Sequence, residues 1–152
     1  MAEIRRHLRD FIGAHTWEEL CREWLLRASA NGALPVVVDQ VGSVWTRAAQ
    51  VDVVGVNSME KVLVLGECKW GPEPIGRSVL TMLVDKTGEI VPSEGQWQVM
   101  YLGFARDGWT EASHATAEDI GSSQPDGKNW RTTGMRLLDL LQVDQDLAAW
   151  LR

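Results

Sequence analysis

Two strongly apolar segments of the chain are interrupted by charged residues. Asp52 lies among the valines of QVDVVGV at 50–56, and Glu67 and Lys69 lie at the end of KVLVLGECKW at 61–70. A charge inside so apolar a strand is costly unless it is paired or binds a metal ion. Two carboxylates suit Mg²⁺ or Mn²⁺ rather than zinc, and the lysine adds a donor that offsets charge on a phosphoryl group. These residue types therefore predict metal-dependent hydrolysis of a phosphodiester.

The order of these residues predicts a hairpin that gathers them on one face. Both apolar segments are rich in β-branched residues and a short turn separates them, so we expect an antiparallel pair of strands. Side chains alternate between the faces of a strand, which puts Glu67 and Lys69 on one face and the side chain of Cys68 on the other. The main-chain carbonyl of Cys68 remains a candidate metal ligand, and its thiol is expected to pack rather than to act as a nucleophile.

Two registers of this hairpin bring Asp52 to the same face as Glu67. A turn centred between Ser58 and Met59 places Asp52 opposite Leu65, with Glu67 as its diagonal neighbour. A turn centred one residue later places Asp52 directly opposite Glu67. Cross-strand neighbours have Cβ atoms about 4.5–5.5 Å apart, so both registers allow the carboxylates to share one divalent cation. A register one residue off would move Asp52 to the other face and remove the site.

The first helix contributes a further acidic residue. Apolar side chains recur at helical spacing over residues 3–29, in a stripe that includes Trp17 and Cys21. Glu18 lies at the edge of this stripe, where the helix is expected to meet the sheet. Glu19 lies on the solvent side. Glu18 is therefore the better candidate for a functional acid.

The rest of the chain alternates between strand and helix patterns. Thr16 and Glu19 match a capping box for the part of the first helix that follows them. The remaining expected elements are a short strand at 42–47, a helix at 75–83, a buried strand at 97–105, a helix at 110–119, a strand at 135–140 and a helix at 142–151. This order indicates one domain, 1–152, in which a sheet lies between helices, as in α/β or α+β sandwiches.

Composition and charge limit the possible functions. The chain has 15 Lys and Arg against 21 Asp and Glu, a net charge of -6, which argues against tight nonspecific binding of nucleic acid. We see no signal peptide and no apolar run of the ~18 residues that a membrane helix needs. Cys21 and Cys68 show no paired spacing, so we expect a reduced, cytoplasmic setting. Most of the 8 tryptophans are expected in the core, with some at a partner surface.

The motif residues resemble a known nuclease signature. Asp52 followed by Glu67-Cys68-Lys69 resembles the D-(x)n-(D/E)-x-K pattern of the PD-(D/E)XK nuclease superfamily. Over most of residues 5–105 the chain is also similar to the C-terminal nuclease-like domain of archaeal-type AAA (DEXX-box) ATPases. The stretches that carry this similarity are RHLRDFIGAHTWEELCREWL at 6–25, VDVV at 51–54 and ECKW at 67–70.

The resemblance implies a fold, a cofactor and roles for four residues. The fold is restriction-endonuclease-like, an α/β arrangement with a central mixed sheet flanked by helices, and the cofactor is Mg²⁺ or Mn²⁺. Asp52 and Glu67 are implied as metal ligands, Lys69 as the catalytic lysine and Glu18 as an auxiliary acid.

Two features depart from the family pattern. Val51 stands where the superfamily signature has its proline. The ATPase motor is also missing, because the segment at 121–129 is one residue too long for a phosphate loop and ends in Asn129. The chain is therefore either a stand-alone homologue or a domain separated from its motor.

We expect from these residues an endonuclease that acts on DNA, alone or beside an ATPase domain or subunit. The alternative is an inactive module of the same fold that docks a partner or nucleic acid, which the acidic charge and the tryptophans favour. A third interpretation is a structural charge cluster in which Asp52 or Glu67 pairs with Lys69. Weaker site candidates, each more simply explained as a core-rim or surface residue, are Gln98, Arg47 and Arg77.

Overall fold

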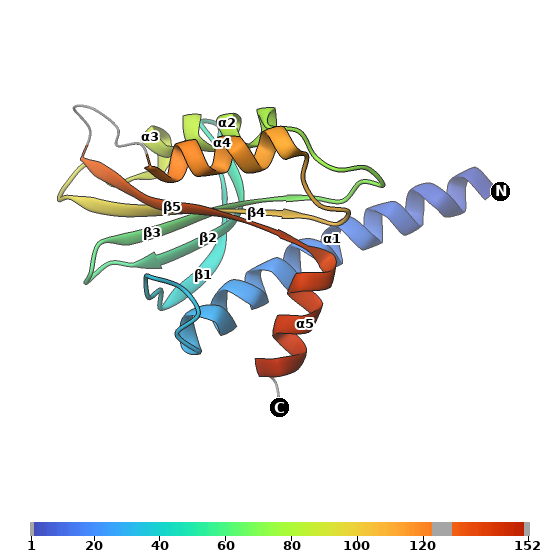
Figure 1. The fold of residues 1–152 in the computed structure, drawn as a ribbon, viewed down its shortest axis with the longest axis horizontal. Helices are drawn as coiled ribbons and strands as arrows, with labels where there is room; N and C mark the ends of the chain where they lie inside the picture. Colours follow the sequence, from blue (N-terminus) through green and yellow to red (C-terminus); the bar gives the residue numbers. More distant parts are fainter. Residues whose placement is uncertain (1, 123–128, 151–152) are drawn as a thin grey trace.

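The computed structural model describes the backbone of residues 2–122 and 129–150, and within those ranges the side chains from residue 15 onward. Its strands form one sheet, and helices lie on both faces of that sheet (Figure 1). The strands are β1 (Gln40–Trp45), β2 (Gln50–Asn57), β3 (Val62–Lys69), β4 (Trp97–Ala105) and β5 (Trp130–Asp139). The helices are α1 (Ala2–Ala30), α2 (Ser78–Asp85), α3 (Thr87–Ile90), α4 (Glu111–Ser122) and α5 (Leu140–Trp150).

The strands follow one another across the sheet in chain order. β1, β2 and β3 are antiparallel neighbours, whereas β3, β4 and β5 are parallel. Parallel neighbours need a crossover connection. The first crossover contains α2 and α3 and the second contains α4, and all three helices lie on the same face of the sheet (Figure 1). The predicted α/β class with a mixed sheet flanked by helices is confirmed, and the arrangement is consistent with a restriction-endonuclease-like fold.

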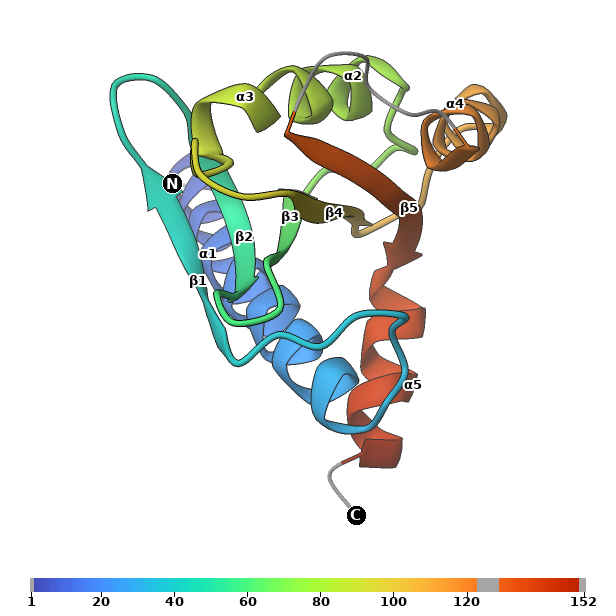
Figure 2. The ribbon, with the colours of Figure 1, turned by 90° about the vertical axis from the view of Figure 1, so that its left-hand side faces the viewer.

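Helices α1 and α5 cover the opposite face (Figure 2). The predicted apolar stripe of α1 is buried against the sheet, with Trp17, Trp24 and Leu25 at most 1% exposed. Trp24 also donates its indole N–H to Oδ2 of Asp146 on α5 at 2.9 Å. Large aromatic side chains bury about 150–250 Å² each, so this face anchors α1 firmly. Because Glu18 lies on α1, the packing of this helix also fixes the position of Glu18 relative to the sheet.

The close approach of α1 to β2 depends on Gly55. A Cβ atom at this position would lie 2.8 Å from Cδ2 of Leu25 and 3.1 Å from Cγ1 of Val38. A larger residue would meet these side chains and push the helix away from the strand. Glycine inside a strand often marks such a close approach. Gly55 therefore helps to set the separation between α1 and the strand that carries Asp52.

Most elements lie within three residues of their expected bounds, and three features differ more clearly from the prediction. α1 continues through Thr16 without a break, so the predicted cap is wrong: the helical pattern that begins near residue 3 outweighs the local capping signal. β5 begins at Trp130 rather than at 135, because polar residues such as Arg131 also pair with β4. The short helix α3 was not predicted.

Half of the 8 tryptophans are buried in the core, fewer than the majority that we expected. Trp17, Trp24, Trp97 and Trp109 are buried, whereas Trp45, at the end of the edge strand β1, is 80% exposed. None of the described helices combines the length and apolar character that a bilayer-spanning segment needs.

Candidate active site

The register of β2 and β3 decides where Asp52 lies. The strands pair Val53 with Gly66. Continued by one residue, this register places Asp52 opposite Glu67, which is the second of the two predicted registers. Here the Asp52 side chain reaches the neighbouring strand, since its Oδ2 accepts the main-chain N–H of Cys68 at 3.0 Å. The two candidate metal ligands are thus held side by side.

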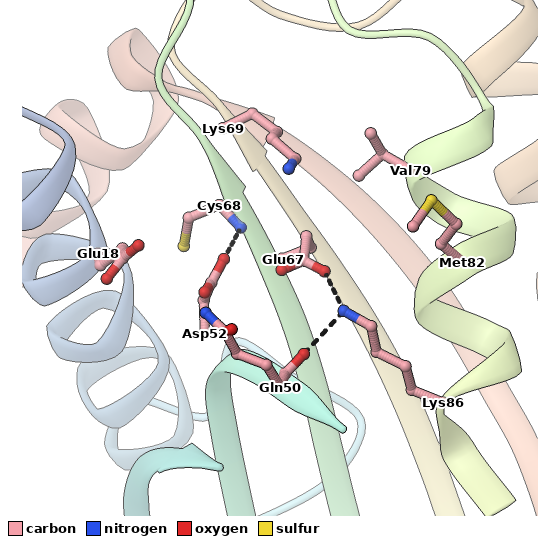
Figure 3. Close-up of a pocket in the computed structure, with 9 residues that line it drawn as sticks. All are labelled: Glu18, Gln50, Asp52, Glu67, Cys68, Lys69, Val79, Met82 and Lys86. Atoms are coloured by element: carbon pink, nitrogen blue, oxygen red, sulfur yellow. Dashed lines mark hydrogen bonds and ion pairs between the residues drawn. The ribbon is translucent and has the colours of Figure 1, made fainter. Parts of the chain in front are cut away.

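A register shift between β2 and its other neighbour, β1, turns Asp52 toward α1. The flanking pairs of β1 and β2 are Gly42 with Val54 and Val44 with Val51. Two steps along β1 therefore match three along β2, as in a β-bulge, and bulges commonly lie beside active sites. Val51 packs on the α2 face of the sheet and Val53 on the α1 face. Asp52, between them, lies with Glu18 on one side and Glu67 on the other (Figure 3).

Glu67 is a buried carboxyl group beside two charged neighbours. It is 8% exposed, and its Oε2 lies 3.1 Å from Nζ of Lys86. Burial, and then the adjacent Asp52 carboxylate, raise the pKa of Glu67 to about 7, although Lys86 acts in the opposite direction. The ionised form is therefore costly near neutral pH, and any cation placed against Glu67 would favour it.

Lys86 is a site residue that the sequence analysis missed. It lies where α2 ends and α3 begins, and its Nζ donates to the main-chain oxygen of Gln50 at 2.7 Å as well as to Glu67. No motif or spacing marks it, because a lysine after a short amphipathic helix is usually a solvated charge. Its ammonium shows that a cation fits between these two oxygen acceptors.

Glu18 approaches the site from α1. Burial raises the pKa of Glu18, and Asp52 adds to the shift, while Arg22 and His15 lower it. Arg22 also donates from Nη1 to the main-chain oxygen of Asp52 at 2.9 Å. Glu19, by contrast, pairs with His15 at 3.1 Å, and 61% of its side chain is exposed. The structure thus places Glu18 toward Asp52 and Glu19 toward solvent, as the helical pattern predicts.

These side chains line one open hollow of about 340 Å³ between α1, the sheet and α2 (Figure 3). Its lining residues are Glu18, Gln50, Asp52, Glu67, Cys68, Lys69, Val79, Met82 and Lys86. Three carboxylates and two ammonium groups therefore meet in a space large enough for a phosphate. All of the residues predicted as catalytic from the sequence, Glu18, Asp52, Glu67 and Lys69, lie there.

The thiol of Cys68 lies on the α1 side of the site, on the same side as Glu18 (Figure 3). It packs in the α1-side core, where burial and the neighbouring Cys21 raise its pKa well above the usual value. A thiol with a raised pKa is a poor nucleophile. Cys68 therefore contributes main-chain atoms to the site. Its N–H donates to Asp52, and its carbonyl remains the predicted metal ligand.

The donor set fits a hard divalent cation. Among the described residues, no group of three or more His, Cys, Asp or Glu side chains has the arrangement of a metal site. The two carboxylates of Asp52 and Glu67 suit Mg²⁺, which usually keeps several waters and takes one or two protein carboxylates plus substrate phosphates. An all-protein zinc site would need more ligands than these two.

The weaker candidates lie elsewhere. Gln98 pairs with Val62 at the start of β3 and lines a separate hollow, so it is remote from Glu67 near the end of that strand. Arg47 and Arg77 are exposed, and neither belongs to the described residues that line the hollow around Asp52.

A family match covers the part of the chain that carries the predicted motif. Residues 1–78 match the model of the DUF234 family, described as "Archaea bacterial proteins of unknown function". The chain belongs to this family. The DUF234 match includes Glu18, Asp52, Glu67 and Lys69 but ends before Lys86. No curated protein and no solved structure gives a significant match.

Proposed function

We propose that this DUF234 domain is a Mg²⁺- or Mn²⁺-dependent endonuclease of the PD-(D/E)XK type that hydrolyses phosphodiester bonds in DNA. The observation that carries the proposal is the convergence of Asp52 and Glu67, from neighbouring strands, on a hollow that Lys69 also lines. The resemblance of these residues to the superfamily signature and the mixed sheet with helices on both faces support the same interpretation.

Asp52 and Glu67, with the main-chain carbonyl of Cys68, are the proposed ligands of the cation. The N–H of Cys68 orients the Asp52 carboxylate, and burial restricts Glu67, so both oxygens are positioned before a cation binds. The bound cation supplies Lewis-acid chemistry, which makes water a better nucleophile and offsets the charge of the phosphate.

Lys69 and Glu18 are proposed to act on the phosphodiester and on water. Hydrolysis adds the water oxygen to phosphorus, breaks one P–O ester bond and delivers a proton to the leaving oxygen. The ammonium of Lys69 stabilises the negative charge that builds on the phosphoryl oxygens. Glu18, on the α1 side of the hollow, accepts a hydrogen bond from the attacking water and helps to remove its proton.

The direct test is cleavage of DNA. Linear, flapped and four-way substrates are incubated with Mg²⁺ or Mn²⁺ at low ionic strength, because an acidic protein binds DNA weakly at high salt. We expect cleavage, most of all at flapped or branched junctions, and its loss in Asp52→Asn. Asp39→Asn removes the same charge from an exposed position before β1 and should stay active. A wild-type protein that binds Mn²⁺ but cuts none of these substrates would contradict the proposal.

A second candidate function is a catalytically inactive binding module of the same fold. The exposed Trp45 favours it, because its side chain is 80% exposed on the edge strand β1 and tryptophan is enriched at interfaces. The family resemblance implies an ATPase domain or subunit as the partner. Trp45→Ala should then reduce co-purification of an ATPase subunit without changing Mn²⁺ binding. Leu141→Ala, at a 65% exposed position on α5, is the matched control.

A further inference from the structure

The negative charge of Glu67 is balanced by a residue from outside the strand pair. Lys86 reaches the hollow from the junction of α2 and α3 and places its Nζ 3.1 Å from Oε2 of Glu67 and 2.7 Å from the oxygen of Gln50 (Figure 3). The side chain of Lys86 is 25% exposed, so its ammonium is accessible from the hollow. A cation-binding position beside Glu67 is thus filled by the protein itself.

The ammonium of Lys86 and a divalent cation compete for this position. Both would share the buried carboxylate of Glu67, and like charges at contact distances repel strongly where water is partly excluded. A cation bound to Glu67 therefore leaves Lys86 without its charged partner and close to a positive ion. The flexible four-carbon stem of lysine lets the ammonium move without a change in the backbone.

A phosphate group removes this conflict. A phosphodiester carries two non-bridging oxygens, so one can bind the cation while the other accepts a hydrogen bond from an ammonium. Lys69 enters the same hollow from the end of β3, and Lys86 enters it from the α2 side, with Glu67 between them (Figure 3). A phosphodiester above Glu67 would thus meet a lysine on each side.

We propose that Lys86 is a phosphate-binding residue that competes with the divalent cation for Glu67 when no DNA is present, and that binds a phosphodiester oxygen when cation and DNA are bound together. This inference rests on the proposed function. It adds a coupling between the divalent cation and DNA, in which each ligand strengthens the binding of the other by the same factor.

Removal of the ammonium should strengthen the binding of a cation alone. Lys86→Met keeps most of the aliphatic stem, and we expect its affinity for Mn²⁺, titrated without DNA, to rise about 5-fold to 10-fold, at the lower end of typical coupling between sites. Lys61→Met removes the same charge from the exposed turn between β2 and β3 and should leave the affinity unchanged. Lys86→Arg keeps the charge and should resemble the wild type.

The same substitution should weaken the binding of DNA in the presence of a cation. The affinity for a single-stranded oligonucleotide is measured by fluorescence anisotropy over a series of salt concentrations, with Ca²⁺, which takes the same oxygen ligands. Loss of one phosphate contact in Lys86→Met should reduce the slope of log affinity against log salt by about 0.7. In EDTA, where Lys86 stays on Glu67, this variant and the wild type should bind DNA alike.

The opposite signs of the two effects distinguish this role from a static salt bridge. If Lys86→Met binds Mn²⁺ more weakly than the wild type, or matches Lys61→Met in both titrations, the proposal for Lys86 is overturned. A wild type that binds Mn²⁺ then leaves the proposed function standing. A wild type that binds no Mn²⁺ overturns both.

Discussion

The carboxylate of Asp52 is held by the main chain of Cys68, whose N–H donates to Oδ2 at 3.0 Å. Cys68 is the residue between Glu67 and Lys69, so the acid on β2 is tied directly to the motif on β3. The main-chain oxygen of Asp52 also accepts a hydrogen bond from Arg22 of α1 at 2.9 Å. Asp52 is therefore fixed from two sides, by the neighbouring strand and by the first helix.

Substitution of Asp52 should separate its structural role from its charge. Asp52→Asn keeps an oxygen acceptor for Cys68, so we expect the free energy of unfolding in urea to fall by about 1 kcal/mol or less. Asp52→Ala leaves the N–H of Cys68 unsatisfied and should lose about 1–3 kcal/mol. Both variants should lose the rise in thermal midpoint that Mn²⁺ gives by binding only the folded state. Equal unfolding free energies for the two variants would show that the hydrogen bond contributes nothing.

Glu67 should make the metal-free domain less stable as the pH rises. Burial, and then the adjacent Asp52, raise the pKa of Glu67 from an ordinary value of 4.5 to about 7. A group whose pKa is raised on folding stabilises the folded state below its unfolded pKa, and that contribution is lost as the pH rises through the folded pKa. In EDTA, the wild type should therefore lose up to about 3 kcal/mol relative to Glu67→Gln between about pH 4.5 and 7. Urea unfolding across this range measures the difference, and parallel curves would refute it.

Much of the site was predictable because strand periodicity leaves few choices. Once 61–70 formed a strand, Glu67 and Lys69 had to share a face, and the valines around Asp52 required a second strand beside it. The choice between the two hairpin registers was not predictable. The turn lacks the Asn-Gly, Asp-Gly or Gly-Gly dipeptide that usually fixes the turn type of a hairpin. The residue with a positive φ is instead Lys61, at 55°.

The remaining features of the site depend on contacts between distant segments. Lys86 meets Glu67 only because α2 packs across the sheet after the chain leaves β3. The register shift that turns Asp52 toward α1 depends on how β1 pairs with β2, which no local pattern specifies. Thr16 shows the converse error, since a capping signal that is valid locally was outweighed by the longer helix.

Glu18→Gln should reduce cleavage less than Asp52→Asn does. Glu18 is proposed to act on water, so its loss should cost about 10²-fold or less in rate, whereas Asp52→Asn removes a ligand of the cation itself. Glu19→Gln is the matched control, because it makes the same change at the next position of α1 but on the solvent side. Rates for the three variants are compared at saturating Mg²⁺. Equal rates for Glu18→Gln and Glu19→Gln would exclude a role for Glu18 in the chemistry.

Lys69→Met should remove most of the cleavage while leaving the cation in place. The ammonium of Lys69 is proposed to stabilise charge that develops in the transition state, and the loss of one such donor costs about 10²–10³ in rate, or about 2.7–4 kcal/mol. Lysine is not a metal ligand, so the affinity for Mn²⁺ should stay close to that of the wild type. Single-turnover cleavage with Mg²⁺ and a Mn²⁺ titration measure the two quantities separately.

The Mn²⁺ titration also separates Lys69 from Lys86. Among the described residues, the ion pair with Glu67 comes from Lys86, so Lys86→Met should raise the affinity for Mn²⁺ and Lys69→Met should not. Lys61→Met controls for the loss of one positive charge and should change neither cleavage nor metal affinity. A Lys69→Met protein that cleaves DNA at the wild-type rate would show that Lys69 has no part in the reaction, and would leave Lys86 as the remaining lysine in the hollow able to stabilise the phosphoryl oxygens.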